Sequence, residues 1–184
     1  MEIINGKADY ELETIWVGAA AMMPTATNGA TSGTTEKATN DINLDYYAFD
    51  TTTEEYIEFD LAMPEAWNRS TIKAHFYWSS ATGSSVNDDV EWEIRAGALS
   101  DSDTIDAALG TAQVITDKVT AANGADLQIT SATPAITVGG TPALNDQIHF
   151  KVSRNVGGTD NMTEDAWLFG VLIQCVKDKS VATW

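Results

Sequence analysis

Residues 90–95 read VEWEIR, three apolar side chains alternating with three charged ones. Successive side chains of a β-strand point to opposite faces, so this alternation predicts a strand with one buried face and one face in water. The same period of two occurs at residues 57–61, 72–78 and 148–153. These four segments predict a chain built mainly from half-buried β-strands.

Residues 166–176 are apolar on both faces. Such a strand lies in the middle of a sheet, or its second face meets another subunit. Weaker strand patterns at residues 13–18, 42–49, 113–118 and 127–130 bring the expected total to about eight or nine strands. Short strands separated by Gly, Asn, Asp, Ser and Thr clusters predict an all-β fold, a jelly-roll-like antiparallel β-sandwich with one short helix and long loops.

The segments between these strands carry other signals. Residues 100–110 begin with a capping serine, continue with acidic residues and end on a glycine, which predicts a short helix or turn. Residues 64–67 begin with a proline and predict a single helical turn. Residues 24–40 and 131–142 lack any periodicity and predict long surface loops.

The length of the chain, 184 residues, suits one domain with an additional arm. We expect residues 1–12 to form an N-terminal arm that packs on a neighbouring subunit, and residues 13–184 to form a single β-sandwich domain. The N-terminus shows no secretion signal, and no run of 18 apolar residues is present, so we expect no membrane partner.

The charge of the chain restricts its partners. Lys and Arg total 10 against 27 Asp and Glu, a formal net charge of −17. A surface this acidic repels phosphate backbones and anionic lipids, which argues against binding to nucleic acid. The acids are dispersed along the chain, as on the solvated surface of a globular protein.

Metal and cofactor sites have little support. His75 and His149 are the only histidines and Cys175 is the only cysteine, so the chain lacks the ligands of a typical structural zinc site and cannot form an intrachain disulfide. Cys175 lies in an apolar run and is expected to be a buried strand thiol. We therefore predict no metal, no cofactor and no dependence of the fold on oxidation.

Enzymatic function has no positive signal either. Asp101, Asp103 and Asp106 lie close together but lack the central glycine and terminal glutamate of a calcium-binding loop, so helix capping explains them better. No nucleophile elbow, phosphate-binding loop or dinucleotide-binding turn is present. A hydrolase that uses an Asp/Glu pair stays an alternative supported only by the abundance of acids, and we predict a protein without catalytic residues.

The aromatic residues are the remaining candidates for a functional surface. Trp78 and Trp92 share the apolar face of their strands and are expected in the core. Five others are freer to line a surface or an interface: Tyr46, Tyr47, Trp67, Tyr77 and Trp184. Since stacked Trp and Tyr side chains can bind sugars, a carbohydrate-binding module is one function that these residues allow.

A series of short motifs runs through nearly the whole chain: IWVGAAAMMP at 15–24, MPEAW at 63–67, FYW at 76–78, VEW at 90–92 and DAWLFGV at 165–171. In this order they resemble proteins encoded among the virion genes of tailed bacteriophages. The motifs are those of packing and turns and contain no catalytic signature. No ligand-binding residue is therefore carried over from the family.

The resemblance implies a non-enzymatic virion structural protein that assembles as a homo-oligomer, with a trimer preferred. The first expectation is a capsid decoration, or cement, protein that is made in the cytoplasm of the host bacterium. It would bind the major capsid protein at the outer head surface and stabilise the head. The alternative is a receptor- or carbohydrate-binding module of a tail fibre.

Overall fold

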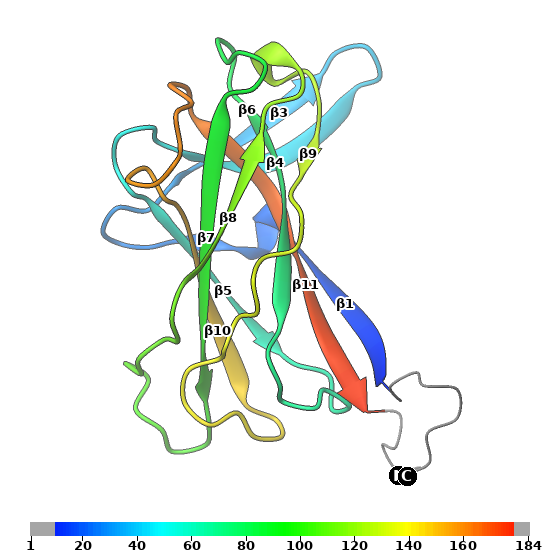
Figure 1. The fold of residues 1–184 in the computed structure, drawn as a ribbon, viewed down its shortest axis with the longest axis vertical. Coiled ribbons are helices and arrows are strands. Elements are labelled where there is room, and N and C mark those ends of the chain that lie inside the picture. Colours follow the sequence, from blue (N-terminus) through cyan, green and yellow to red (C-terminus); the bar gives the residue numbers. More distant parts are fainter. Residues whose placement is uncertain (1–9, 179–184) are drawn as a thin grey trace.

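The computed structural model describes residues 10–178 and consists of two antiparallel β-sheets packed face to face (Figure 1). Sheet A contains, in order, β3 (Thr31–Lys37), β4 (Ile42–Phe49), β11 (Ala166–Asp178), β6 (Lys73–Ser80) and β9 (Gln128–Ile129), and β1 (Tyr10–Gly18) also pairs with β11. Sheet B contains β2 (Met23–Pro24), β5 (Tyr56–Ala62), β10 (Gln147–Arg154), β7 (Asp89–Leu99) and β8 (Gln113–Lys118). The all-β, jelly-roll-like sandwich expected from the sequence is confirmed.

The core lies between the sheets and is centred on Trp92, which is fully buried on β7. Its ring stacks on Phe76 of sheet A at 5.5 Å between centroids and meets the rings of Phe49 and Trp78 edge-on at 5.2 and 6.2 Å. Val90 and Ile94, two residues to either side, are equally buried. The alternation in the sequence therefore predicted the buried face of this strand correctly.

β11 is the central strand of sheet A. It pairs with β6 on one side and with β1 and β4 on the other. Its inner residues Leu168, Val171 and Ile173 are fully buried, while Trp167 and Phe169 lie half-buried on the outer face. The predicted central position of the doubly apolar strand is confirmed. Burial also raises the pKa of Cys175 on this strand to about 11, as expected of a buried thiol.

The predicted helix at residues 100–110 is wrong, and the turn alternative is right. Ser102 has a φ of +69°, which a right-handed helix does not allow, and the Asp103 carboxylate accepts the backbone N–H of Ser100 at 2.9 Å in a local turn. The helices in the described part of the chain are two 3₁₀ turns, Ala19–Ala21 and Ala122–Gly124. Residues 64–67 form one turn, closed by the bond from Trp67 N–H to the Pro64 carbonyl at 2.8 Å.

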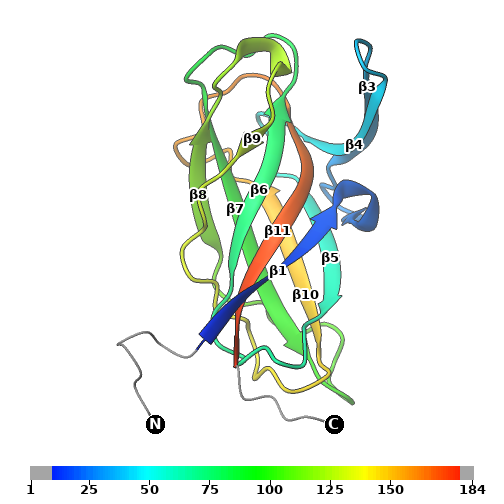
Figure 2. The ribbon, with the colours of Figure 1, turned by 90° about the vertical axis from the view of Figure 1, so that its right-hand side faces the viewer.

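The loop predicted at residues 24–40 is also wrong, because it contains β3. This strand pairs with β4 over its whole length and forms a hairpin that stands away from the body of the sandwich in Figure 2. Thr31, Thr34 and Thr35 supply the β-branched side chains that favour a strand without giving an apolar alternation. The prediction for residues 131–142 is confirmed in part: they form only isolated bridges at Ile136 and Gly139. Ile136 and Val138 are buried in the core, however, so this segment is not a surface loop throughout.

Most of the expected N-terminal arm, residues 1–12, lies outside the described residues. Glu11 and Leu12 belong to β1, where they pair with Lys177 and Val176 of the same chain. Trp184 also lies outside the described residues. Between residues 10 and 178, no helix is long and apolar enough to cross a membrane.

A buried arginine joins the end of β10 to sheet A. The guanidinium of Arg154, fully buried, donates two hydrogen bonds to the Asp160 carboxylate at 2.7 and 2.8 Å. It also donates to the backbone carbonyls of Phe49 at the end of β4 and of Glu164 just before β11, at 3.3 and 2.7 Å. The arginine thus holds three separate chain segments at one end of the sandwich.

We predict that Trp92→Ala lowers the free energy of unfolding by about 3–5 kcal/mol, because it leaves a cavity between the sheets. Trp92→Phe should cost clearly less, since a ring remains and the indole N–H, which has no hydrogen-bond partner, is removed. Urea denaturation followed by circular dichroism measures both values. If both variants lost the same free energy of unfolding, the aromatic ring at position 92 would not be what stabilises the core.

We predict that Arg154→Met lowers the free energy of unfolding by about 3–5 kcal/mol, because Asp160 is left as an unpaired buried carboxylate. The matched control is Arg95→Met, which removes a partly exposed pair with Glu93 and should cost less than about 1 kcal/mol. Thermal denaturation of the two variants distinguishes them. If Arg154→Met lost no more stability than Arg95→Met, Arg154 would not hold the end of the sandwich together as described.

Candidate functional site

The outer face of sheet A carries an open groove of about 330 Å³, here called the aromatic groove. Its aromatic lining comes from Trp16 on β1, Tyr77 on β6 and Phe169 on β11. The hairpin β3–β4 contributes Ile42, Leu44 and Lys37, and the segment before β9 contributes Gly124, Ala125, Asp126 and Leu127. The groove therefore lies between the hairpin and this segment.

Trp16 is the most exposed of the aromatic side chains in the groove, with 50% of its surface accessible. Its ring meets Tyr77 edge-on, with centroids 4.7 Å apart at 75°. It lies over Gly170 of β11, where a Cβ atom would overlap the indole ring. The register of β11 shifts between Leu168 and Gly170, so a local irregularity and a missing side chain together make room for Trp16.

A second aromatic pair extends the surface toward the hairpin. Tyr46 of β4 stacks on Trp167 of β11 at 4.4 Å between centroids and 16° between planes. Tyr46 also meets Phe169 edge-on at 6.5 Å and covers Gly33 of β3, whose Cβ would lie 2.6 Å from the ring. The outer face of sheet A thus presents five aromatic side chains from four strands.

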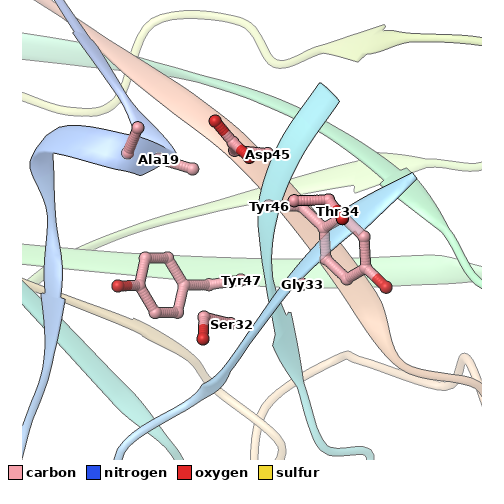
Figure 3. A pocket seen from close by; sticks show the side chains of 8 residues that line it. Ala19, Ser32, Gly33, Thr34, Asp45, Tyr46 and Tyr47 are labelled. Carbon is pink, nitrogen blue, oxygen red and sulfur yellow. The ribbon is translucent and has the colours of Figure 1, made fainter. Parts of the chain in front are cut away.

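The other face of the hairpin borders a polar cleft of about 400 Å³ (Figure 3). The register β3–β4 places Ser32 opposite Tyr47 and Thr34 opposite Asp45, so these four side chains share that face. Ala19 and Ala20 line the cleft as well. The hydroxyl groups and one carboxylate of this cleft thus lie on one face of the hairpin β3–β4, and the aromatic groove lies on its other face.

The two clefts differ in chemistry. The charged residues that line the aromatic groove are Lys37 and Asp126, and the ammonium of Lys37 reaches the Gly124 carbonyl at 3.5 Å. The polar cleft carries Asp45, and the hydroxyl of its buried Tyr47 donates to the Met22 carbonyl at 2.9 Å. Desolvation raises the pKa of Tyr47, so this phenol stays a neutral donor. Both clefts are suited to binding by contact and hydrogen bonding.

Two of the five predicted interface aromatics, Tyr46 and Tyr77, lie in this site. Tyr47 and Trp67 are buried, with 7% and 4% of their surface exposed, which corrects the expectation that both lie freely on a surface. Tyr47 still lies in the wall of the polar cleft. Tyr47 points inward because its register partner is the buried Leu168, and Trp67 bridges to Lys177 at the end of β11. Trp184 lies outside the described residues.

Sequence reasoning did not single out Trp16, Trp167 and Phe169. A signal was present: a central strand that is apolar on both faces must show half of its apolar side chains on the outer face of the sheet. Trp167 and Phe169 lie two residues apart and therefore share that face. Trp16 alternates with the inward-facing Ile15 and Val17, which assigns it to the outer face as well.

The residues considered for a metal site are not brought together. His75 Nδ1 lies 2.9 Å from the Thr130 carbonyl on sheet A, and His149 Nδ1 lies 2.8 Å from Asp60 on sheet B. Within residues 10–178, no group of three or more His, Cys, Asp or Glu side chains is arranged to hold a metal ion.

No family model matches the sequence, and no curated protein matches it. Similar folds occur among solved structures. One is a Clostridium thermocellum xylanase chain with a family 22 carbohydrate-binding module and a catalytic module, in complex with xylohexaose: 13% identity, TM-score 0.48, 96% of this chain covered. The present chain spans only 30% of that xylanase chain.

Two further similar structures are matched over nearly their whole length. A family 11 carbohydrate-binding module from Clostridium thermocellum, in complex with a mixed-linked tetrasaccharide, has 10% identity and a TM-score of 0.42 over 94% of this chain and 92% of its own. A protein of unknown function from Shewanella oneidensis has 10% identity and a TM-score of 0.34 over 95% and 90%. At these identities the likeness concerns the fold alone.

We predict that Gly170→Ala lowers the free energy of unfolding by about 1–3 kcal/mol and displaces Trp16, because the new Cβ overlaps the indole ring. The control is Gly157→Ala, where the nearest atom to a new Cβ lies 3.7 Å away and little change is expected. Denaturation curves and tryptophan fluorescence measure both effects. An unchanged emission spectrum in Gly170→Ala would contradict the packing described for Trp16.

Proposed function

We propose that this chain is a non-catalytic binding module whose aromatic groove binds a glycan chain. The observation that carries the proposal is the half-exposed Trp16, held edge-on by Tyr77 in an open groove of about 330 Å³. Large apolar side chains that gather in an open surface groove usually indicate a binding site, because an ordinary solvated surface exposes such side chains only singly. The proposal rests on this groove and not on the likeness of fold.

The chemistry of the groove suits a sugar. A pyranose ring offers a carbon–hydrogen face that packs on an indole or phenol ring, and its hydroxyl groups remain at the edge. Lys37 and Asp126 lie among the lining residues and can donate to and accept from such hydroxyls. A few polar groups in a mainly apolar lining are the usual composition of a ligand site, in which the polar groups supply orientation.

The polar cleft gives a longer ligand further contacts. Ser32, Thr34 and Asp45 lie on the face of the hairpin opposite to Leu44 and Ile42, which line the aromatic groove. A glycan chain that stacks on Trp16 and passes around the hairpin would reach these hydroxyl and carboxylate groups. An oligosaccharide therefore fits this surface better than a monosaccharide.

The experiment is a glycan array followed by titration calorimetry with the best oligosaccharide. We expect Trp16→Ala to weaken binding by at least about tenfold, as expected for loss of a central aromatic contact. The matched control is Tyr56→Ala on the outer face of sheet B, where the Lys151 ammonium lies 4.3 Å from the centre of the phenol ring. The affinity of this variant for the oligosaccharide should equal that of the parent. The proposal fails if no glycan binds, or if both variants bind as the parent does.

A second function, in keeping with the phage resemblance, is favoured by one observation. Apolar side chains that are at least half exposed lie in and beside the groove: Ile42 at 50%, Leu127 at 56% and Ile129, the strand partner of Tyr77, at 50%. An exposed apolar surface of this kind would also suit a protein interface. Under this second proposal the chain is a capsid decoration protein, a homo-oligomer on the outer head surface that binds the major capsid protein.

Light scattering at low and high salt tests the second function. An apolar interface needs to bury about 1,000 Å² or more and resists salt, since screening weakens exposed ion pairs only. We expect an oligomer at both salt concentrations, and binding to capsids that lack the protein. A monomer in both conditions that also fails to bind such capsids would exclude this function.

A further inference from the structure

The loop between β7 and β8 presents an isoleucine to solvent. Ile105 has 88% of its surface exposed, more than any other large apolar side chain described in this structure. The loop lies at the opposite end of the sandwich from the hairpin β3–β4 (Figure 1). A single exposed isoleucine on a loosely held loop needs no functional explanation. The contacts that anchor this loop therefore decide whether Ile105 can form part of a defined binding surface.

Both ends of this loop are fixed. At its start, the hydroxyl of Ser100 donates to the Asp146 carboxylate at 2.9 Å. At its end, the Gly110 N–H donates to the Ala96 carbonyl at 2.9 Å, and a Cβ on Gly110 would overlap the Thr137 carbonyl oxygen. Glycine is therefore required where the loop returns to the sheet. The loop is thus fixed at both ends, and Ile105 lies between the two anchored points.

Ile105 lies between two clefts and lines both. The first, of about 240 Å³, is lined by Ile105 and Leu109 from the loop and by Asp60 and His149 from β5 and β10. The second, of about 440 Å³, is lined by Ile105, Asp101 and Asp103 among others. Leu99 and Gln147 are common to both clefts. The two clefts thus form one continuous surface with an apolar ridge between them.

The charge of this surface has one sign. Asp60 lines the first cleft and Asp101 and Asp103 line the second, whereas no Lys or Arg is among the described residues that line either. Asp60 accepts a hydrogen bond from His149, yet 42% of its side chain remains exposed. Carboxylates beside aliphatic side chains match a lysine or arginine, whose stem is apolar and whose head is cationic.

We propose that these two clefts dock a basic segment of a partner protein in which lysine or arginine residues alternate with aliphatic ones. The cationic side chains enter the clefts, where their stems pack on Leu99 and Leu109 and their heads reach Asp60 on one side and Asp101 and Asp103 on the other. An aliphatic side chain of the partner packs on Ile105. The docking surface lies on sheet B and its loop, so it is independent of the aromatic groove on sheet A.

The test uses a capped pentapeptide of alternating lysine and leucine, with a pentapeptide of alternating glutamate and leucine as its counterpart. Methyl signals of the full chain are followed by nuclear magnetic resonance during titration. We expect the lysine peptide to shift the methyl signals of Ile105, Leu99 and Leu109, and the glutamate peptide to leave them in place. High salt should weaken the binding, because exposed carboxylates contribute to it.

Ile105→Ser should lower the affinity for the lysine peptide by about fivefold or more, as expected for loss of a residue that anchors an interface. Val86→Ser is the control: Val86 is 52% exposed in the segment between β6 and β7, at the opposite end of β7 from Leu99, and it lines neither cleft. This variant should bind the peptide as tightly as the parent does. The proposal is overturned if the methyl signals do not move, if the glutamate peptide binds equally well, or if Ile105→Ser binds as the parent does. Shifts confined to residues near Trp16 would also overturn it.

Discussion

The buried guanidinium of Arg154 is the contact that sets the two sheets in relation to each other at one end of the sandwich. Its bidentate pair with Asp160 neutralises the charge, and its bonds to the carbonyls of Phe49 and Glu164 fix the end of β4 and the approach to β11. An unpaired charge in this place would be costly, so the segments cannot separate independently. Because β4 carries Tyr46 and β11 carries Trp167 and Phe169, this internal contact also fixes the strands of three of the five outer aromatics.

The outer faces of the two sheets differ in chemistry. Sheet A exposes Trp16 and its aromatic neighbours in a groove where Lys37 and Asp126 are the charged lining residues. Sheet B exposes a network in which Lys151 lies near Glu58 and over Tyr56. An apolar surface and a charged surface thus lie on opposite faces of one core. The excess of acids adds long-range repulsion of anions to both faces.

The strands with clear alternation were predictable, since a period of two is a property of neighbouring residues. The two errors occur where contacts between segments decide the structure. Residues 100–110 carry a helix start signal, but Ser102 adopts a left-handed conformation and the segment bonds back to the sheet at Gly110. β3 has threonines and serine in place of an apolar alternation, and only its pairing with β4 makes it a strand. In both segments, contacts with distant residues overrode the local signal.

The sequence by itself determined the fold class, the buried face of Trp92 and the central position of the doubly apolar strand, because each follows from the order of side chains along one strand. The tertiary structure decided which strands are neighbours. Pairing of β1 with β11 brings Trp16 over Gly170 and against Tyr77, and pairing of β4 with β11 buries Tyr47 while it stacks Tyr46 on Trp167. Strand alternation gives each residue a face but no partner across the sheet, so the groove exists only once residues far apart in the chain are paired.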